Sequence, residues 1–192
     1  MVRLSRIYTR AGDGGRTRLG DMSEADKHDP RVDAYGTVDE ANAAIGLAIC
    51  ALEPDHELIE LLRAIQNDLF DLGADLCVPD RGEPLEFEPL RVTPAQTERL
   101  EQFIDRYNER LEPLNSFILP GGSELSARLH IARTITRRAE RCVTALIADG
   151  EPVSAAVLTY LNRLSDLLFV LARIANDDGQ TDILWTPGAG RS

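Results

Sequence analysis

The sequence predicts an all-α protein: a bundle of five helices in an up-down, ferritin-like arrangement, preceded by a flexible N-terminal loop. Apolar residues recur at helical spacing in five segments, and we find no internal repeat and no convincing β-hairpin. The chain has 192 residues, of which 43% are hydrophobic, which suits one globular domain. We expect a single domain over 1–192, made of an N-terminal segment (1–30), the bundle (31–178) and a tail (179–192).

The first two helices are separated by a short break at Pro54. Apolar residues at helical spacing predict the first helix from about Asp33 to Leu52 and the second from about Asp55 to Cys77. The segment from Leu4 to Thr9 is compatible with a short extended piece, but its pattern does not predict a strand.

The remaining helices begin at recognisable starting signals. Thr93, Pro94 and Gln96 form a capping-box sequence that predicts a third helix, which reaches about Leu111. Apolar periodicity and a terminal glycine predict the fourth helix from about Ser123 to Ala148. Pro152 opens the fifth, which ends near Asn176.

Charge and composition narrow the classes of function. The net charge of −11 argues against a nucleic-acid partner, because phosphate contacts require a positive field. No apolar run approaches the roughly 18 to 20 residues that cross a bilayer, and the N-terminus lacks a secretory signal. We therefore expect a cytoplasmic protein without a membrane partner. Three widely spaced cysteines, Cys50, Cys77 and Cys142, are expected to be small buried hydrophobic residues.

The fourth helix carries a stripe of charged residues beside its apolar face. Helical geometry places Arg133, Arg137, Glu140 and Arg141 along one flank, whereas Arg138 points well away. One interpretation is a solvated basic face with weak salt bridges. The other is a functional stripe, because guanidinium groups suit phosphate or carboxylate oxygens.

Three other features each allow two interpretations. Asn162 lies beside an apolar stripe, and its amide could cap a backbone group or bind a ribose or base. The loop Phe117–Gly122 could plug the end of the bundle or present an aromatic ring to a large flat ligand. The glycine-rich segment Tyr8–Asp21 is not a Walker A loop, yet it could surround phosphate oxygens with backbone N–H groups; position alone would favour a disordered terminus.

Several motifs together resemble one family. YTRAGDGGRT, DPRVDAYGTVDEANAAIG, FILPGG, ARTITRRAER and LNRLSD occur in the order found in the PduO-type ATP:cob(I)alamin adenosyltransferases and span residues 7–166. The resemblance implies a homotrimeric bundle with active sites between subunits. It implies transfer of the 5′-deoxyadenosyl group of ATP to the cobalt of reduced cobalamin, with release of triphosphate and with Mg²⁺ accompanying the nucleotide. A cobalamin reductase and an adenosylcobalamin-dependent mutase are expected partners.

The resemblance also implies roles for individual residues. The N-terminal segment would close over ATP through Thr9, Arg10, Ala11, Gly12, Asp13, Thr17 and Arg18, with Lys27 near the phosphates. The bundle would contact the nucleotide through Arg137, Arg138, Glu140, Arg141 and Asn162. Arg133 resembles an arginine that pairs with an aspartate, here Asp39, across the subunit interface, and Phe117 resembles the aromatic that displaces the lower axial ligand of the corrin. The family usually has lysine where this chain has Arg10, which keeps the charge but changes its geometry.

Three alternatives remain. A helical interaction protein could dock an acidic partner on the arginine stripe. A di-iron carboxylate bundle would need paired Glu-x-x-His motifs, and the only match, Glu53 with His56, is interrupted by Pro54. Within the family, the chain could serve chiefly to deliver adenosylcobalamin to a mutase.

Overall fold

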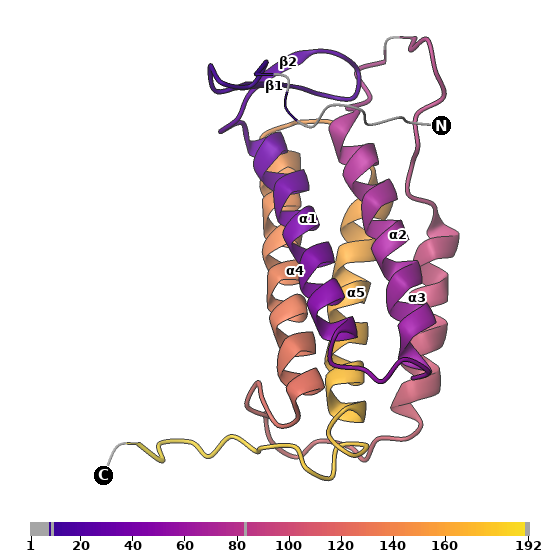
Figure 1. The fold of residues 1–192 in the computed structure, drawn as a ribbon, viewed down its shortest axis with the longest axis vertical. Helices are drawn as coiled ribbons and strands as arrows, with labels where there is room; N and C mark the ends of the chain where they lie inside the picture. Colours follow the sequence, from indigo (N-terminus) through magenta and orange to yellow (C-terminus); the bar gives the residue numbers. More distant parts are fainter. Residues whose placement is uncertain (1–7, 9, 83, 191–192) are drawn as a thin grey trace.

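The computed structural model describes residues 8, 10–82 and 84–190, and these residues contain the five predicted helices. The helices are α1 (Pro30–Ile49), α2 (Leu58–Cys77), α3 (Pro94–Asn108), α4 (Glu124–Ala148) and α5 (Ala155–Ile174). Consecutive helices run in opposite directions, so the predicted up-down bundle is confirmed (Figure 1).

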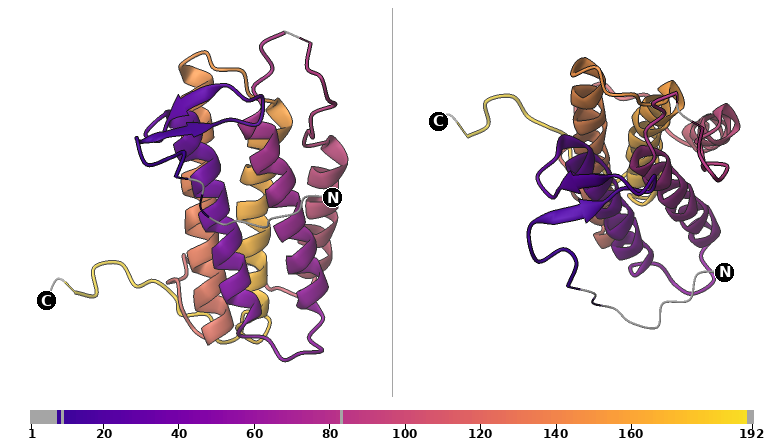
Figure 2. Two further views of the ribbon diagram at one scale, coloured as in Figure 1. Left: turned by 45° about the horizontal axis from the view of Figure 1, so that its top comes forward. Right: turned by 90° about the horizontal axis from the view of Figure 1, so that it is seen from above.

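One hydrophobic core holds the helices together. α1 packs against α2 and α4, and α5 packs against α4 and α3, which lies at the outside of the bundle (Figure 2). Leu62, Leu72, Leu129, Leu164 and Leu168 belong to this core and are completely buried. Burial of apolar residues at helical spacing, here along α2, α4 and α5, is the main source of stability for the bundle.

α2 begins at Leu58, later than the expected Asp55, without a side-chain cap. Two other helix starts differ slightly from the expected ones because side chains cap them. α1 begins at Pro30, earlier than predicted, because the Asp29 carboxylate accepts a hydrogen bond from the backbone N–H of Arg31 (2.8 Å). α5 begins after Pro152, because Ser154 accepts from the N–H of Ala156 (3.3 Å) and becomes the N-cap.

The N-terminal segment contains a hairpin, so the prediction that the chain has no hairpin is wrong. Strand β1 (Arg16–Arg18) pairs antiparallel with β2 (Glu24–Asp26). Each strand has three residues, too few for a detectable alternation of polar and apolar side chains. Tertiary contacts hold the hairpin: Leu19 and Ala25 are buried, and the N–H of Gly20 donates to the carbonyl of Cys77 at the end of α2 (2.8 Å). The extended piece considered for Leu4–Thr9 lies, except for Tyr8, outside the described residues.

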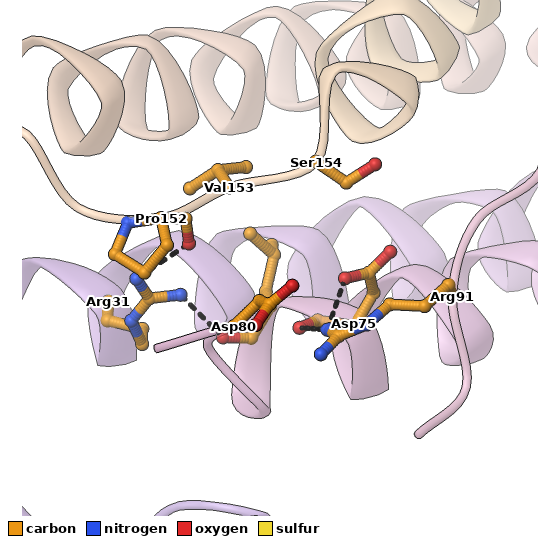
Figure 3. Close-up of a pocket in the computed structure, with 8 residues that line it drawn as sticks. Arg31, Asp75, Asp80, Arg91, Pro152, Val153 and Ser154 are labelled. Atoms are coloured by element: carbon orange, nitrogen blue, oxygen red, sulfur yellow. Dashed lines mark hydrogen bonds and ion pairs between the residues drawn. The ribbon is translucent and has the colours of Figure 1, made fainter. Parts of the chain in front are cut away.

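A buried arginine joins three elements at this end of the bundle (Figure 3). Arg31 donates to the carbonyls of Leu76 (2.9 Å) and Pro152 (3.1 Å) and to the carboxylate of Glu151 (2.9 Å). Nearby, Arg91 donates to Asp75 (2.7 Å). Arg31, Asp75 and Arg91 line a cavity of about 410 Å³, but their charges are paired within the chain, so we assign the cavity a structural role.

Two expectations about burial need correction. Cys50 is exposed because it follows the last residue of α1, and Cys77 and Cys142 are only partly buried; all three are free thiols. α5 is long and apolar enough to meet the criteria for a membrane span, contrary to the expectation that no run approaches that length. More than half of that window is buried inside the bundle, and a core helix meets the same criteria.

Candidate functional site

The hairpin forms a polar pocket, here called the hairpin pocket, with a volume of about 620 Å³. It is lined by Ala11, Gly12, Arg16, Thr17, Arg18, Glu24 and Lys27. Five of the residues predicted to surround ATP therefore lie together. Arg16 and Glu24 were missed; they form a 3.3 Å ion pair across the two strands, a relation that only the hairpin register reveals.

The remaining predicted residues of this segment lie beside the pocket or outside the described part. Arg10 and Asp13 are exposed, and the guanidinium of Arg10 lies 5.8 Å from the centre of the Tyr8 ring. Arg10 adopts a left-handed backbone conformation (φ 62°), which is uncommon for a residue with a side chain. Thr9 lies outside the described residues.

Three arginines of α4 form what we call the arginine flank: Arg133, Arg137 and Arg141. Arg133 is half-buried; its Nε donates to Nδ1 of His130 (3.2 Å), and its guanidinium lies 6.0 Å from the centre of the Phe169 ring. Burial, with a smaller effect from Arg137, lowers the pKa of Arg133. An anion placed here would offset both effects, because an opposite charge stabilises the protonated guanidinium.

The arginine flank differs from the other arginines of α4. Arg128 forms an ion pair with Glu124, and Arg138 forms one with Glu40 of α1. Across the described part of the chain, no flank arginine has such a pair; Arg141 donates to the carbonyl oxygen of Arg137 (3.0 Å). The interpretation of the flank as a salt-bridged surface is therefore not supported. Contact between Arg138 and a nucleotide would require breaking its pair with Glu40.

Glu140 and Asn162 connect α4 with α5 beside the flank. The amide of Asn162 donates to the carboxylate of Glu140 (2.8 Å), and the Asn162 side chain is exposed. Among the described residues, the side-chain amide of Asn162 therefore donates to a carboxylate and caps no backbone group.

Asp39 lies on α1 and forms no ion pair with the described residues. It is exposed and lines an apolar groove between α1 and α2, together with Tyr35, Val38 and Phe70. The Phe70 side chain is 71% exposed, an unusual position for a phenylalanine in a helix. Asp39 and Arg133 thus both lack a partner of opposite charge in the described part of one chain.

Phe117 is presented to solvent at the opposite end of the bundle from the hairpin. Its residue is 77% exposed, and its ring forms an edge contact with Trp185 of the C-terminal segment (6.1 Å between centroids). This segment leaves the bundle beside the start of α4 (Figure 1). Of the two interpretations of the loop, the structure favours presentation of an aromatic ring over plugging of the bundle.

The predicted nucleotide residues form two separate groups within one chain. The hairpin pocket is lined only by residues 11–27. Arg137 lies eleven residues before the end of α4 at Ala148, roughly 16 Å along the helix axis from that end. In the described residues of one chain, no flank arginine lines the hairpin pocket.

Comparisons with known proteins identify the family. A model of the cobalamin adenosyltransferase family matches residues 7–175. A corrinoid adenosyltransferase of Mycobacterium tuberculosis is 54% identical over 192 residues, which covers 100% of this chain and 98% of that protein. A cobalamin adenosyltransferase of Cupriavidus metallidurans is 46% identical over 184 residues, 95% of each chain.

Solved structures agree with this assignment. The chain is similar to a phenylalanine-to-histidine variant of the PduO-type ATP:corrinoid adenosyltransferase of Lactobacillus reuteri, complexed with cobalamin and ATP (TM-score 0.85, 40% identity, 95% of this chain and 97% of that one). It is also similar to an arginine-to-lysine variant of that enzyme complexed with ATP (TM-score 0.83, 41% identity, 94% and 100%). This chain is therefore a member of the cobalamin adenosyltransferase family, of the PduO type.

Proposed function

We propose that this protein transfers the 5′-deoxyadenosyl group of ATP to the cobalt of cob(I)alamin, giving adenosylcobalamin and triphosphate. The observation that carries the proposal is the likeness, over 95% of the chain, to a PduO-type enzyme whose structure holds cobalamin and ATP. The flank arginines, free of carboxylate partners in the described residues, supply the polyanion site that this reaction requires.

The reaction needs no nucleophile from the protein. Cobalt(I) attacks C5′ of the ribose with its own electron pair, the cobalt–carbon bond forms, and the C5′–oxygen bond breaks. Triphosphate leaves with the electrons of that bond. The residues of this chain have to position the two substrates, which can lower the barrier by roughly 7–11 kcal/mol, and stabilise the charge on the leaving group.

We place the triphosphate between the hairpin pocket of one subunit and the arginine flank of the next. Lys27, Arg137 and Arg141 would stabilise the departing charge, and Glu140 would orient Asn162 toward the nucleoside. This placement would need two subunits, because in the described residues of one chain no flank arginine lines the hairpin pocket. A homotrimer is supported by Asp39 and Arg133, each without a partner of opposite charge in the described residues, which would pair across the interface.

Mg²⁺ would accompany ATP and be held mainly by phosphate oxygens. In the described residues, no group of three or more histidine, cysteine, aspartate or glutamate side chains is arranged to hold a metal. A nucleotide-bound Mg²⁺ is usually held by substrate phosphates with one or two carboxylates.

Phe117 would act on the other substrate. Its exposed ring would lie against the lower face of the corrin and exclude the axial ligand, leaving a four-coordinate cobalt that is easier to reduce. A reductase would supply the electron and a mutase would receive the product. We place these steps in the cytoplasm, where ATP is available and where the three free cysteines would remain reduced.

The test is spectroscopic. Chemically reduced cobalamin is mixed with the protein with and without Mg-ATP, and the visible absorption of adenosylcobalamin is followed while triphosphate is quantified. We expect one triphosphate per adenosylcobalamin and no product without ATP. A protein that binds adenosylcobalamin but forms none would instead be a delivery protein, and one that binds neither substrate would be a helical interaction protein.

A further inference from the structure

We propose that Trp185 is a positioning residue for Phe117, and that Asp182 anchors the C-terminal segment that carries Trp185. The inference rests on the proposed function, because it assigns Phe117 a place beside the corrin. The loop–tail unit, as we call it here, comprises residues 116–119 of the loop before α4 and residues 182–185 of the C-terminal segment.

A buried carboxylate fixes the start of the C-terminal segment. The side chain of Asp182 is 3% exposed and accepts hydrogen bonds from Nε of Arg173 (2.8 Å) and from the amide of Asn176 (3.1 Å). Arg173 also donates to the carbonyl of Glu112 (3.0 Å). Since a buried ion pair is strongly destabilised when one partner is lost, these contacts hold the segment to the end of α5.

Beyond Asp182 the segment pairs with the loop as a short antiparallel ladder. Ile118 is opposite Leu184; the N–H of Leu119 donates to the carbonyl of Ile183 (2.7 Å). The N–H of Trp185 donates to the carbonyl of Phe117 (2.8 Å). The hydroxyl of Ser116 also donates to the carbonyl of Trp185 (3.0 Å).

This register puts four apolar residues on one face of the ladder. In an antiparallel pair, directly opposite residues project to the same side, and side chains alternate along each strand. Phe117 with Trp185 and Leu119 with Ile183 therefore share a face, and each of these residues is at least 44% exposed. An exposed apolar patch of this kind, built from two distant segments, indicates a binding surface.

Trp185 supplies the ring contact of Phe117 in the described structure. The two rings meet edge to face at 6.1 Å, a geometry that favours one orientation of the phenylalanine ring. Phe117 is otherwise largely exposed on a loop. A ring that has to exclude an axial ligand must stay in one position, so loss of Trp185 should weaken that exclusion while leaving the fold intact.

The contact can first be tested without any corrinoid. Trp185 is the only tryptophan of the chain, so intrinsic fluorescence reports on this site alone. We expect Phe117→Ala to shift the emission maximum to longer wavelength and to increase quenching by iodide. Leu90→Ala, at an exposed loop position, should leave both unchanged. Identical emission and quenching in Phe117→Ala and the unsubstituted protein would overturn the contact.

The positioning role of Trp185 is tested by measuring the coordination of cobalt in bound cob(II)alamin. Cob(II)alamin is added to the protein saturated with Mg-ATP, and its visible spectrum gives the ratio of four-coordinate to five-coordinate cobalt. We expect Trp185→Ala to lower this ratio by about 3- to 10-fold, the range that an aromatic pair supports, and Trp185→Phe to restore most of it. ATP affinity should stay unchanged in both variants.

Failure of this inference differs from failure of the proposed function. If the unsubstituted protein forms adenosylcobalamin and Trp185→Ala gives the same ratio of four-coordinate cobalt, the positioning role is wrong and the activity stands. If the unsubstituted protein never forms four-coordinate cobalt or product, the function itself is wrong. The fluorescence result is independent of both.

Discussion

The two ends of the bundle are built differently. The hairpin is held mainly by backbone hydrogen bonds and by two buried apolar residues, Leu19 and Ala25, and its charged side chains are exposed. The loop–tail unit is attached through buried polar side chains, Asp182, Arg173 and Asn176. Between the two ends runs α4 with the arginine flank.

This difference indicates how each end of the bundle should respond to a ligand. A polar segment with exposed charges gains its stabilising contacts when a polyanion arrives, so we expect the hairpin to become fully ordered on ATP binding. The loop–tail unit already has its charges paired, so we expect it to be preformed and to offer an apolar surface.

The largest effect is expected at the arginine flank. Arg137→Ala should lower kcat at saturating cobalamin by about 10²- to 10³-fold, because a donor aimed at developing charge is lost. Cobalamin affinity should change little, since Arg137 is expected to contact the triphosphate and not the corrin. Steady-state kinetics measures both. Arg63→Ala, which removes an exposed arginine from α2, is the control; equal turnover in both variants would remove Arg137 from the catalytic groups.

Substitution of two glycines tests whether the loop–tail unit is more rigid than the hairpin. Gly122 has φ 102°, and an added Cβ would lie 2.3 Å from the buried side chain of Asn176; Gly15 has φ 78° but open space around it. Gly122→Ala should therefore lower the free energy of unfolding by about 2–4 kcal/mol and Gly15→Ala by about 1 kcal/mol. Urea denaturation measures both values. A larger loss of unfolding free energy in Gly15→Ala than in Gly122→Ala would contradict the expected difference in rigidity.

The hairpin pocket should respond to nucleotide, and Lys27 should contribute to that response. Lys27→Ala should weaken Mg-ATP binding about tenfold, because one charge-assisted hydrogen bond to phosphate is lost. Calorimetric titration measures the affinity. Limited trypsin digestion tests ordering: ATP should slow cleavage after Arg16 and Arg18 in the unsubstituted protein. Equal rates of cleavage with and without ATP would show that ATP does not order the hairpin.

The smallest effect concerns His130, beside the flank. Burial, followed by the charge of Arg133, lowers the pKa of His130, and Asp182 opposes this only in part. Below about pH 6.5 the unfolded state therefore binds more protons at this site than the folded state, so stability falls as pH drops from there through the folded pKa.

The experiment compares urea unfolding at pH 7.5 and pH 5.5. His130→Gln should lose less stability between these pH values than the unsubstituted protein, while His28→Gln, at an exposed position, should lose the same amount as the unsubstituted protein. Parallel losses in all three proteins would show that carboxylates alone set the acid sensitivity.

Helix content and several site residues could be predicted from the chain alone. The five helices follow from the spacing of residues such as Leu62, Leu69 and Leu129, which the structure buries. The position of Arg133, Arg137 and Arg141 on one flank follows from 100° per residue. The family was predicted from the motifs, and the comparisons confirmed it. The individual roles of the site residues stay predictions.

Other features depended on contacts between distant segments. The hairpin was missed because three-residue strands carry no periodic signal, and its stability comes from docking on α2. The pairing of Arg138 with Glu40, which separates it from the flank arginines, joins residues 98 positions apart. The edge contact between Phe117 and Trp185 likewise required the antiparallel ladder that Asp182 anchors.

The sequence by itself determined the elements that depend on local periodicity. These are the helices, their core faces and the positions of the charged residues along one flank of α4. Only the tertiary structure decided which charges are paired within the chain and which stay open to a ligand. The physical reason is that an ion pair or a ring contact depends on distance in space, and residues far apart in the sequence become neighbours only when the helices pack.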